Sequence, residues 1–63
     1  MEESILKYFK FEHLPQRLGE VSKPFCDLAQ SLLELPRCAE RTVALRKLLE
    51  SKDAAVRAAL ESA

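Results

Sequence analysis

Features that define enzymes and metal proteins are missing from this 63-residue chain. It has a single glycine, so no glycine-rich phosphate loop exists, and its one histidine and two cysteines form no CxxC motif and no His/Cys cluster. A metal site is therefore not predicted. No pair of catalytic carboxylates and no Ser/His/Asp set can be assembled, and His13 has no nucleophile near it in the sequence. We predict a protein that is not an enzyme and uses no metal or cofactor.

Long apolar runs and an excess of charge are missing as well. No apolar run approaches the roughly eighteen residues that a membrane-spanning helix requires, so no membrane partner is predicted. Ten basic and ten acidic side chains give a formal net charge of zero, which argues against a general polyanion binder. Because a basic recognition helix is also lacking, a regulator that binds duplex nucleic acid is disfavoured.

The two cysteines, Cys26 and Cys38, are not expected to pair. In a hairpin that turns near Pro36, Cys26 lies about 15 Å along the first helix, beyond disulfide reach of Cys38. Two isolated thiols without a signal peptide are typical of a protein in a reducing cytosol.

Helical periodicity is the strongest structural pattern that the chain does contain. From residue 14 onward, large apolar residues recur in steps of four and three, as on one face of a helix. These positions are Leu14, Leu18, Val21, Phe25, Leu28, Leu32 and Leu35. They predict a first helix over about 14–35, in which Pro24 either kinks one long helix or marks the first turn of a helix that starts near 23. Pro36 then breaks the pattern, and a second helix is predicted over about 39–60.

A link of only a few residues between two helices predicts an antiparallel hairpin. The fold prediction is therefore an all-α single domain over residues 1–63, with an N-terminal arm over 1–13 and a two-helix hairpin. A chain of this length buries only about 60% of its extended surface, and an isolated hairpin leaves one side of each apolar stripe exposed. We therefore expect a homo-oligomer.

The arm is the aromatic part of the chain, because residues 7–13 hold three of the four aromatic side chains, interleaved with two lysines. One interpretation is an extended strap, with Phe9 and Phe11 turned inward over the open end of the hairpin. The other uses one aromatic ring to stack on a purine, with a nearby cation on the phosphate. The residues alone favour the strap, and the two interpretations are compatible. Lys52, at the edge of the second helix's apolar stripe, is either a solvated lysine at an interface rim, which the residues favour, or a cation aimed into a pocket formed between protomers.

Four segments carry a family pattern: FEHLP at 11–15, DLA at 27–29, ERTVALRKLLE at 40–50 after a proline break, and AAVRAA at 54–59. With these segments, the chain resembles the small phage proteins that share the anti-CBASS and anti-Thoeris hairpin domain, over about residues 9–60. Proteins of that family are immune-evasion sponges, which bind cyclic oligonucleotide or cyclic ADP-ribose signals without degrading them. The resemblance implies the same activity here, in the cytoplasm of the bacterial host during infection.

The resemblance also implies a site and partners. It implies interlocked dimers, assembled into a hexamer in several members, with the cyclic nucleotide bound between protomers. Phe11 would be the stacking aromatic and Lys23 the phosphate contact. The other implied ligand-binding residues are Tyr8 and Phe9 from the arm, and Arg41, Thr42 and Arg46 from the second helix. The alternative is a small helical oligomeric protein-interaction module with no nucleotide ligand.

Overall fold

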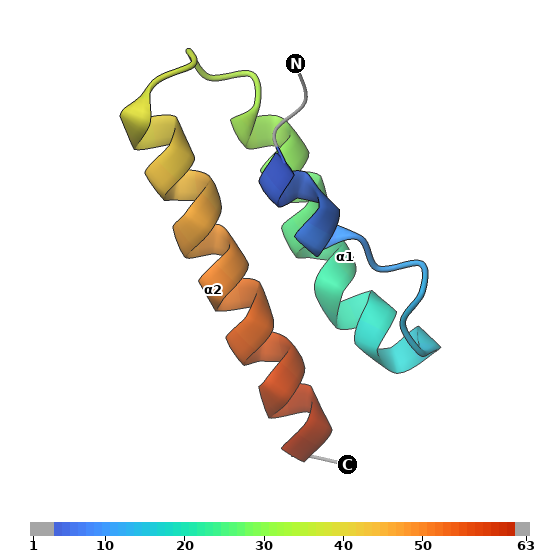
Figure 1. The fold of residues 1–63 in the computed structure, drawn as a ribbon. Helices are drawn as coiled ribbons and strands as arrows, with labels where there is room; N and C mark the ends of the chain where they lie inside the picture. The colour runs from blue at the N-terminus through green and yellow to red at the C-terminus, as the bar shows by residue number, and fades with distance from the viewer. Residues whose placement is uncertain (1–3, 62–63) are drawn as a thin grey trace.

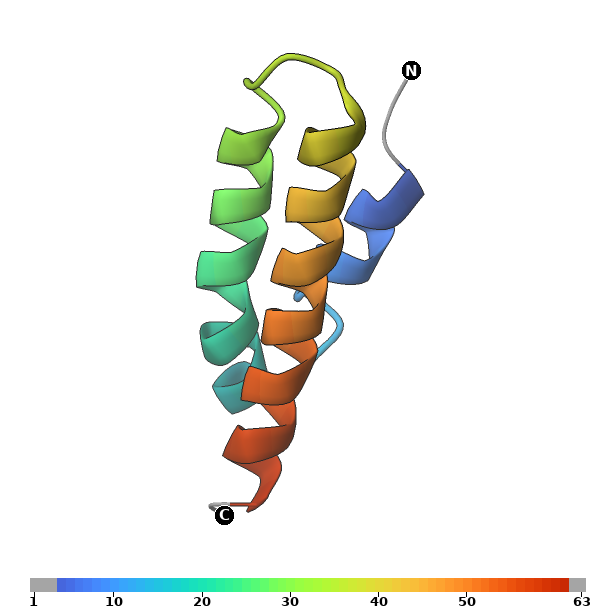
Figure 2. The ribbon, with the colours of Figure 1, turned by 90° about the vertical axis from the view of Figure 1, so that its left-hand side faces the viewer.

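Two antiparallel helices and a short N-terminal helix make up the computed structural model, which describes residues 4–61 (Figure 1). The 3-10 helix η1 spans Ser4–Phe9, and the α-helices α1 and α2 span Gln16–Leu32 and Ala39–Glu61. The molecule is a rod of 39 × 18 × 16 Å, and η1 packs across one face of the hairpin in contact with both long helices (Figure 2). The prediction of an all-α chain with two helices packed as a hairpin is confirmed for the part of the chain that the structure describes.

Pro24 lies inside α1, because this helix begins at Gln16 and continues past Pro24. The helix therefore does not start near 23. Proline removes one hydrogen bond of the helical ladder and costs about 3 kcal/mol in a helix interior, so the packing of α1 must offset this cost. The Pro24 ring lies on the exposed side of the helix.

Both ends of α1 lie inside the predicted range of 14–35. Pro15 precedes the helix, and its carbonyl oxygen accepts the backbone N–H of Gly19 at 2.9 Å. After Leu32 the chain tightens into three-residue turns, in which the N–H of Leu35 bonds to the carbonyl of Leu32 at 3.1 Å. The cause is Pro36, which disfavours α-helical geometry at the residue before it. The second helix, α2, lies close to its predicted range.

The fully buried positions of α1 carry small side chains, and the predicted large ones lie beside them. Gly19, Ser22 and Ala29 are the buried residues of α1. Small residues let a neighbouring helix approach closely, and Leu45 of α2 fills the core beside Ala29. The predicted leucine stripe lies to one side of these positions, so Phe25 and Leu32 pack against the core while Leu28 and Leu35 each remain 49% exposed. On α2, the apolar side chains of Val43 and Leu60 are exposed as well.

The arm covers the hairpin, but as a 3-10 helix instead of an extended strap. Side chains on a 3-10 helix return to the same face about every three residues, whereas those of an extended strap alternate every two. Different residues of the arm therefore point inward. Phe9 is fully buried against the hairpin, with Ile5 and Leu6 packed around it. Tyr8 points outward, and Phe11 is half-buried where its backbone approaches Gly19. The first three residues of the predicted arm lie outside the described residues.

Candidate functional site

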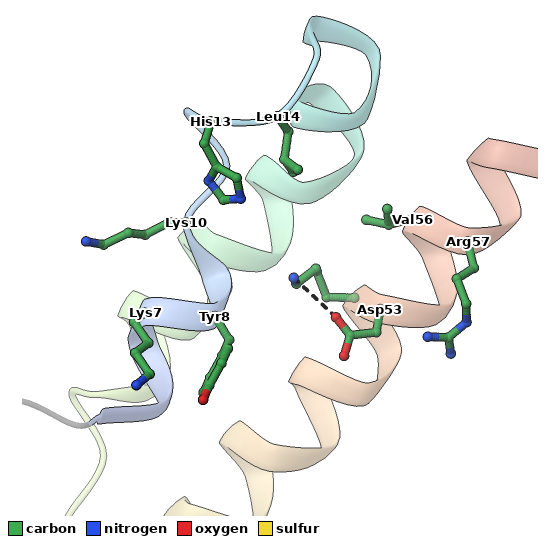
Figure 3. Close-up of a pocket in the computed structure, with 9 residues that line it drawn as sticks. Lys7, Tyr8, Lys10, His13, Leu14, Asp53, Val56 and Arg57 are labelled. Atoms are coloured by element: carbon green, nitrogen blue, oxygen red, sulfur yellow. Dashed lines mark ion pairs between the residues drawn. The ribbon is translucent and has the colours of Figure 1, made fainter.

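A cleft lies between the N-terminal arm and the C-terminal half of α2, with a volume of about 380 Å³ (Figure 3). We call it the cationic cleft. Its lining comes from η1, from the loop that follows η1, and from two turns of α2. The residues that line it are Lys7, Tyr8, Lys10, His13, Leu14, Lys52, Asp53, Val56 and Arg57.

Positive charge is concentrated in the cationic cleft. Four of its lining side chains are cationic, namely those of Lys7, Lys10, Lys52 and Arg57, and Asp53 is the one carboxylate among them. The whole chain has a formal net charge of zero, so this excess is local. Several cations around one concave surface raise the local concentration of anions, and they can form charge-assisted hydrogen bonds to phosphate.

Lys52 is the least solvated of these cations. Its side chain is only 12% exposed, and its Nζ lies 3.2 Å from Oδ1 of Asp53, an ion pair drawn as the dashed line in Figure 3. The Nζ of Lys52 is thus held at the wall of the cleft by the carboxylate of the next residue. Lys52 lines a cleft within one protomer, whereas its place in a pocket between protomers stays a prediction.

Tyr8 forms the aromatic wall of the cationic cleft. Its side chain is 55% exposed, and Nζ of Lys7 lies 5.2 Å from the centroid of the ring, within the range of a cation–π contact. The adjacent residue, Phe9, is fully buried, which anchors η1 and fixes the side from which Tyr8 projects. Leu14 and Val56 add apolar surface to the lining.

This arrangement can hold an anionic molecule that also has a flat apolar part. An aromatic face contributes about 1–3 kcal/mol by stacking on a base, and the cations can contact phosphate oxygens. Within residues 4–61, no group of three or more His, Cys, Asp or Glu side chains is placed to hold a metal ion. The lining itself offers an aromatic face and cationic side chains, which suit recognition by stacking and charge.

The three predicted aromatic residues of the arm have different environments. Tyr8 lines the cationic cleft, and Phe9 lies in the core. Phe11 does not line the cleft; its carbonyl oxygen accepts the N–H of Leu14 at 3.0 Å, in the turn that leads to α1. Tyr8 is thus the predicted aromatic that is available to stack on a ligand within one protomer.

The predicted polar residues do not line the cleft either. Lys23 forms an exposed ion pair of 3.1 Å with Asp27, and Arg46 is exposed on α2. Nη1 of Arg41 donates to the carbonyl oxygens of Leu33 and Leu35, both at 3.1 Å. These bonds tie the start of α2 to the end of α1.

Thr42 has a structural contact of its own, since its hydroxyl donates to the carbonyl of Cys38 at 3.4 Å in the first turn of α2. The site implied by the family resemblance lies between protomers, so the role of these residues in binding stays a prediction.

Sequence reasoning missed most of the cationic cleft. Lys52 had been singled out, but Lys7, Lys10 and Arg57 had not been connected with it. One pattern could have found part of the site: Lys52 and Val56, like Asp53 and Arg57, are spaced by four residues and therefore share one side of a helix. The missing information was which side of α2 the arm covers.

Comparison of the chain with models of protein families, with curated proteins and with solved structures found no match. Neither α1 nor α2 has a stretch that is long and apolar enough to cross a membrane.

Proposed function

We propose that the protein is a phage immune-evasion sponge, which binds and sequesters a cyclic nucleotide second messenger without cleaving it. The observation that supports this function best is the cationic cleft, in which the exposed ring of Tyr8 stands among four cationic side chains. The family resemblance supplies the class of ligand: cyclic di- or trinucleotides, or signals of the cyclic ADP-ribose type. The compartment is the cytoplasm of the infected host.

The size of the cleft supports binding between protomers. A volume of about 380 Å³ lies near the lower end of the range for small-molecule sites, so one cleft takes about one nucleotide unit. A cyclic di- or trinucleotide then needs clefts from two or more copies of the chain. A sponge must out-compete the host receptor, which requires nanomolar affinity, or about −12 kcal/mol. Two or three stacked bases with charge-assisted phosphate contacts can supply this free energy.

Isothermal titration of the protein with a panel of cyclic di- and trinucleotides and cyclic ADP-ribose variants tests the proposal. We expect saturable binding of at least one ligand, and chromatography should recover that ligand intact. Absence of heat for every ligand would overturn the function, and a degraded ligand would contradict sequestration.

Charge reversal tests whether the cationic cleft is the site. Arg57→Glu should weaken binding about tenfold or more, because it repels phosphate from the cleft. Lys47→Glu is the matched control, since Lys47 is exposed on the same helix and does not line the cleft. Arg46→Glu separates the two candidate sites: if it weakens binding and Arg57→Glu does not, the ligand contacts the residues implied by the resemblance instead.

A protein-interaction module is the second candidate function. The observation that favours it is the apolar surface at Leu28 of α1 and at Leu35 of the turn that follows, both of which remain half exposed. A helical oligomer that docks on another protein would use such a surface. This function would be favoured if the chain binds a protein partner and binds none of the nucleotides in the panel.

A further inference from the structure

Asp53 is the feature of the cationic cleft that phosphate binding does not explain. A carboxylate repels a phosphate, so a site that served only to hold anions would be stronger without it. Asp53 nevertheless lines the cleft, and its side chain is 47% exposed there. Figure 3 shows its carboxylate turned towards the space between α2 and Tyr8. A group that accepts hydrogen bonds is therefore available to the ligand beside the aromatic wall.

The hydrogen-bonding capacity of Asp53 is only partly used. Nζ of Lys52 lies against Oδ1, and the described residues give Asp53 no second partner. An ionised carboxylate has about four lone-pair positions on its two oxygens and no hydrogen to donate. Asp53 can thus keep its contact with Lys52 and still accept two parallel hydrogen bonds from a ligand.

We propose that Asp53 makes the cationic cleft selective for a guanine base. This inference rests on the proposed function and names the base that the same site reads. Guanine carries two neighbouring donors, the N1–H and the N2 amino group, which match the two oxygens of a carboxylate. Adenine presents a lone pair at N1 beside its single amino donor, so a carboxylate facing that edge is repelled. A site built to accept both donors rejects the base that lacks them.

The other side chains of the cleft fit this arrangement. The Tyr8 ring provides an aromatic face on which a guanine can stack, and Asp53 lies across the cleft from this ring (Figure 3). Lys10 and Arg57 lie on opposite sides of the cleft (Figure 3) and have no ion pair within the described residues, so either one is available for the phosphate. The site therefore separates its tasks: aromatic face for the ring, carboxylate for the edge, and cations for the phosphate.

Asp53 also has a structural explanation, because it neutralises the half-buried Lys52. The two explanations predict different results. If Asp53 only supports Lys52, its replacement changes the affinity for all nucleotides by the same factor. If Asp53 reads guanine, the replacement changes the affinity for guanine nucleotides selectively.

The test is isothermal titration of the full chain with GMP, IMP and AMP, and with cyclic di-GMP and cyclic di-AMP, at one fixed salt concentration. We expect GMP to bind about tenfold more tightly than AMP, with IMP between them because it keeps N1–H and lacks the amino group. Asp53→Asn should bring the three affinities close together, since an amide offers one acceptor and one donor. Asp27→Asn is the control, because Asp27 is an exposed carboxylate outside the cleft.

The outcomes separate the two proposals. Equal affinities for GMP and AMP, or a preference for AMP, overturn the guanine inference and leave the proposed function standing. A guanine preference that survives in Asp53→Asn also overturns it. Absence of binding for all five nucleotides overturns the inference together with cyclic-dinucleotide sequestration. The ranking in the unmodified protein decides the matter even if the variant does not fold.

Discussion

Ser22 shows how a single residue can serve packing at the expense of hydrogen bonding. It lies in the middle of α1, fully buried, and its hydroxyl has no hydrogen-bond partner among the described residues. Burying a hydroxyl without a partner costs about 1–3 kcal/mol. What the position requires is a small side chain, which lets the elements around α1 pack closely against it.

Replacement of Ser22 by alanine should therefore stabilise the fold. We expect the free energy of unfolding to rise by about 1 kcal/mol in Ser22→Ala, because the small volume is kept and the unpaired hydroxyl is removed. Urea denaturation followed by circular dichroism, at one protein concentration, measures this change. A loss of stability in Ser22→Ala would mean that the hydroxyl has a partner in solution.

The thiols of Cys26 and Cys38 differ in their exposure to solvent. Both cysteines are free, as the spacing predicted; Cys38 is exposed and Cys26 is half-buried. Burial raises the pKa of the Cys26 thiol, and the carboxylates of Asp27 and Glu12 raise it further, while Lys23 acts in the opposite direction. The thiolate is the reactive form, so Cys26 should react slowly near neutral pH.

Disulfide exchange with DTNB checks this difference. The Cys38→Ser variant, which retains Cys26, should react several-fold more slowly near neutral pH than Cys26→Ser, which retains Cys38. The difference should narrow only as the pH rises past the raised pKa of Cys26, where this thiol ionises as well. Equal rates at all pH values, or a faster Cys26, would contradict the described environment.

At the scale of elements, the hairpin turn depends on Arg41. Its guanidinium donates to two carbonyl oxygens in the turns that follow α1, those of Leu33 and Leu35, and so fastens α2 to this turn. Hydrogen bonds from a charged group contribute about 1.5–3 kcal/mol. The turn itself is short, so these bonds fix the direction in which α2 leaves it.

Two arginines of α2, Arg41 and Arg46, allow a matched test of whether Arg41 fastens the turn. Arg41→Ala should lower the free energy of unfolding by about 2 kcal/mol, because two carbonyl oxygens lose their donor. Arg46→Ala removes the same side chain from an exposed position on the same helix and should change stability by no more than about 0.5 kcal/mol. Thermal denaturation compares the melting temperatures of the two variants, and we expect the lower one for Arg41→Ala. Equal melting temperatures would show that Arg41 does not fasten the turn.

The elements were largely predictable from sequence, but their packing was not. Proline positions and apolar spacing located the two helices, since both act through local geometry. They could not tell whether Pro24 lies within a helix, because packing of the surrounding turns outweighs a local penalty. Apolar spacing located Phe25 and Leu32, which pack against the core, but it did not indicate that the fully buried residues of α1 are Gly19, Ser22 and Ala29.

The cationic cleft was even harder to predict, because its two walls are far apart in the sequence. Tyr8 was identified from the aromatic cluster. Its meeting with Lys52, Asp53 and Arg57 depends on η1 being a 3-10 helix that docks through Phe9. No local pattern in the sequence determines that docking direction.

At the scale of the whole molecule, the hairpin retains apolar surface that a second copy of the chain can cover. Leu28 and Leu35 are half exposed, and a chain of 63 residues has little core of its own. The central ligand proposal also requires several clefts close together, so self-association and ligand binding should be linked.

Light scattering coupled to size-exclusion chromatography tests the association. We expect a mass that is a multiple of the protomer mass, and Leu28→Glu should shift the population towards smaller species by placing a charge in the apolar contact. Gln30→Glu, which adds the same charge to an exposed polar position of α1, should leave the mass unchanged. A monomer at every concentration would contradict the oligomer.

The central claim is that a nucleotide stacks on Tyr8 in the cationic cleft, and this residue is the single tyrosine of the chain. Its ring signals in a proton–carbon NMR spectrum therefore report on the cleft without ambiguity, with the buried ring of Phe9 as an internal reference. Titration with cyclic di-GMP should move the Tyr8 ring protons upfield to saturation, with the same dissociation constant as the heat of binding. A saturable heat with no change at Tyr8, or no change in either measurement, would contradict the account.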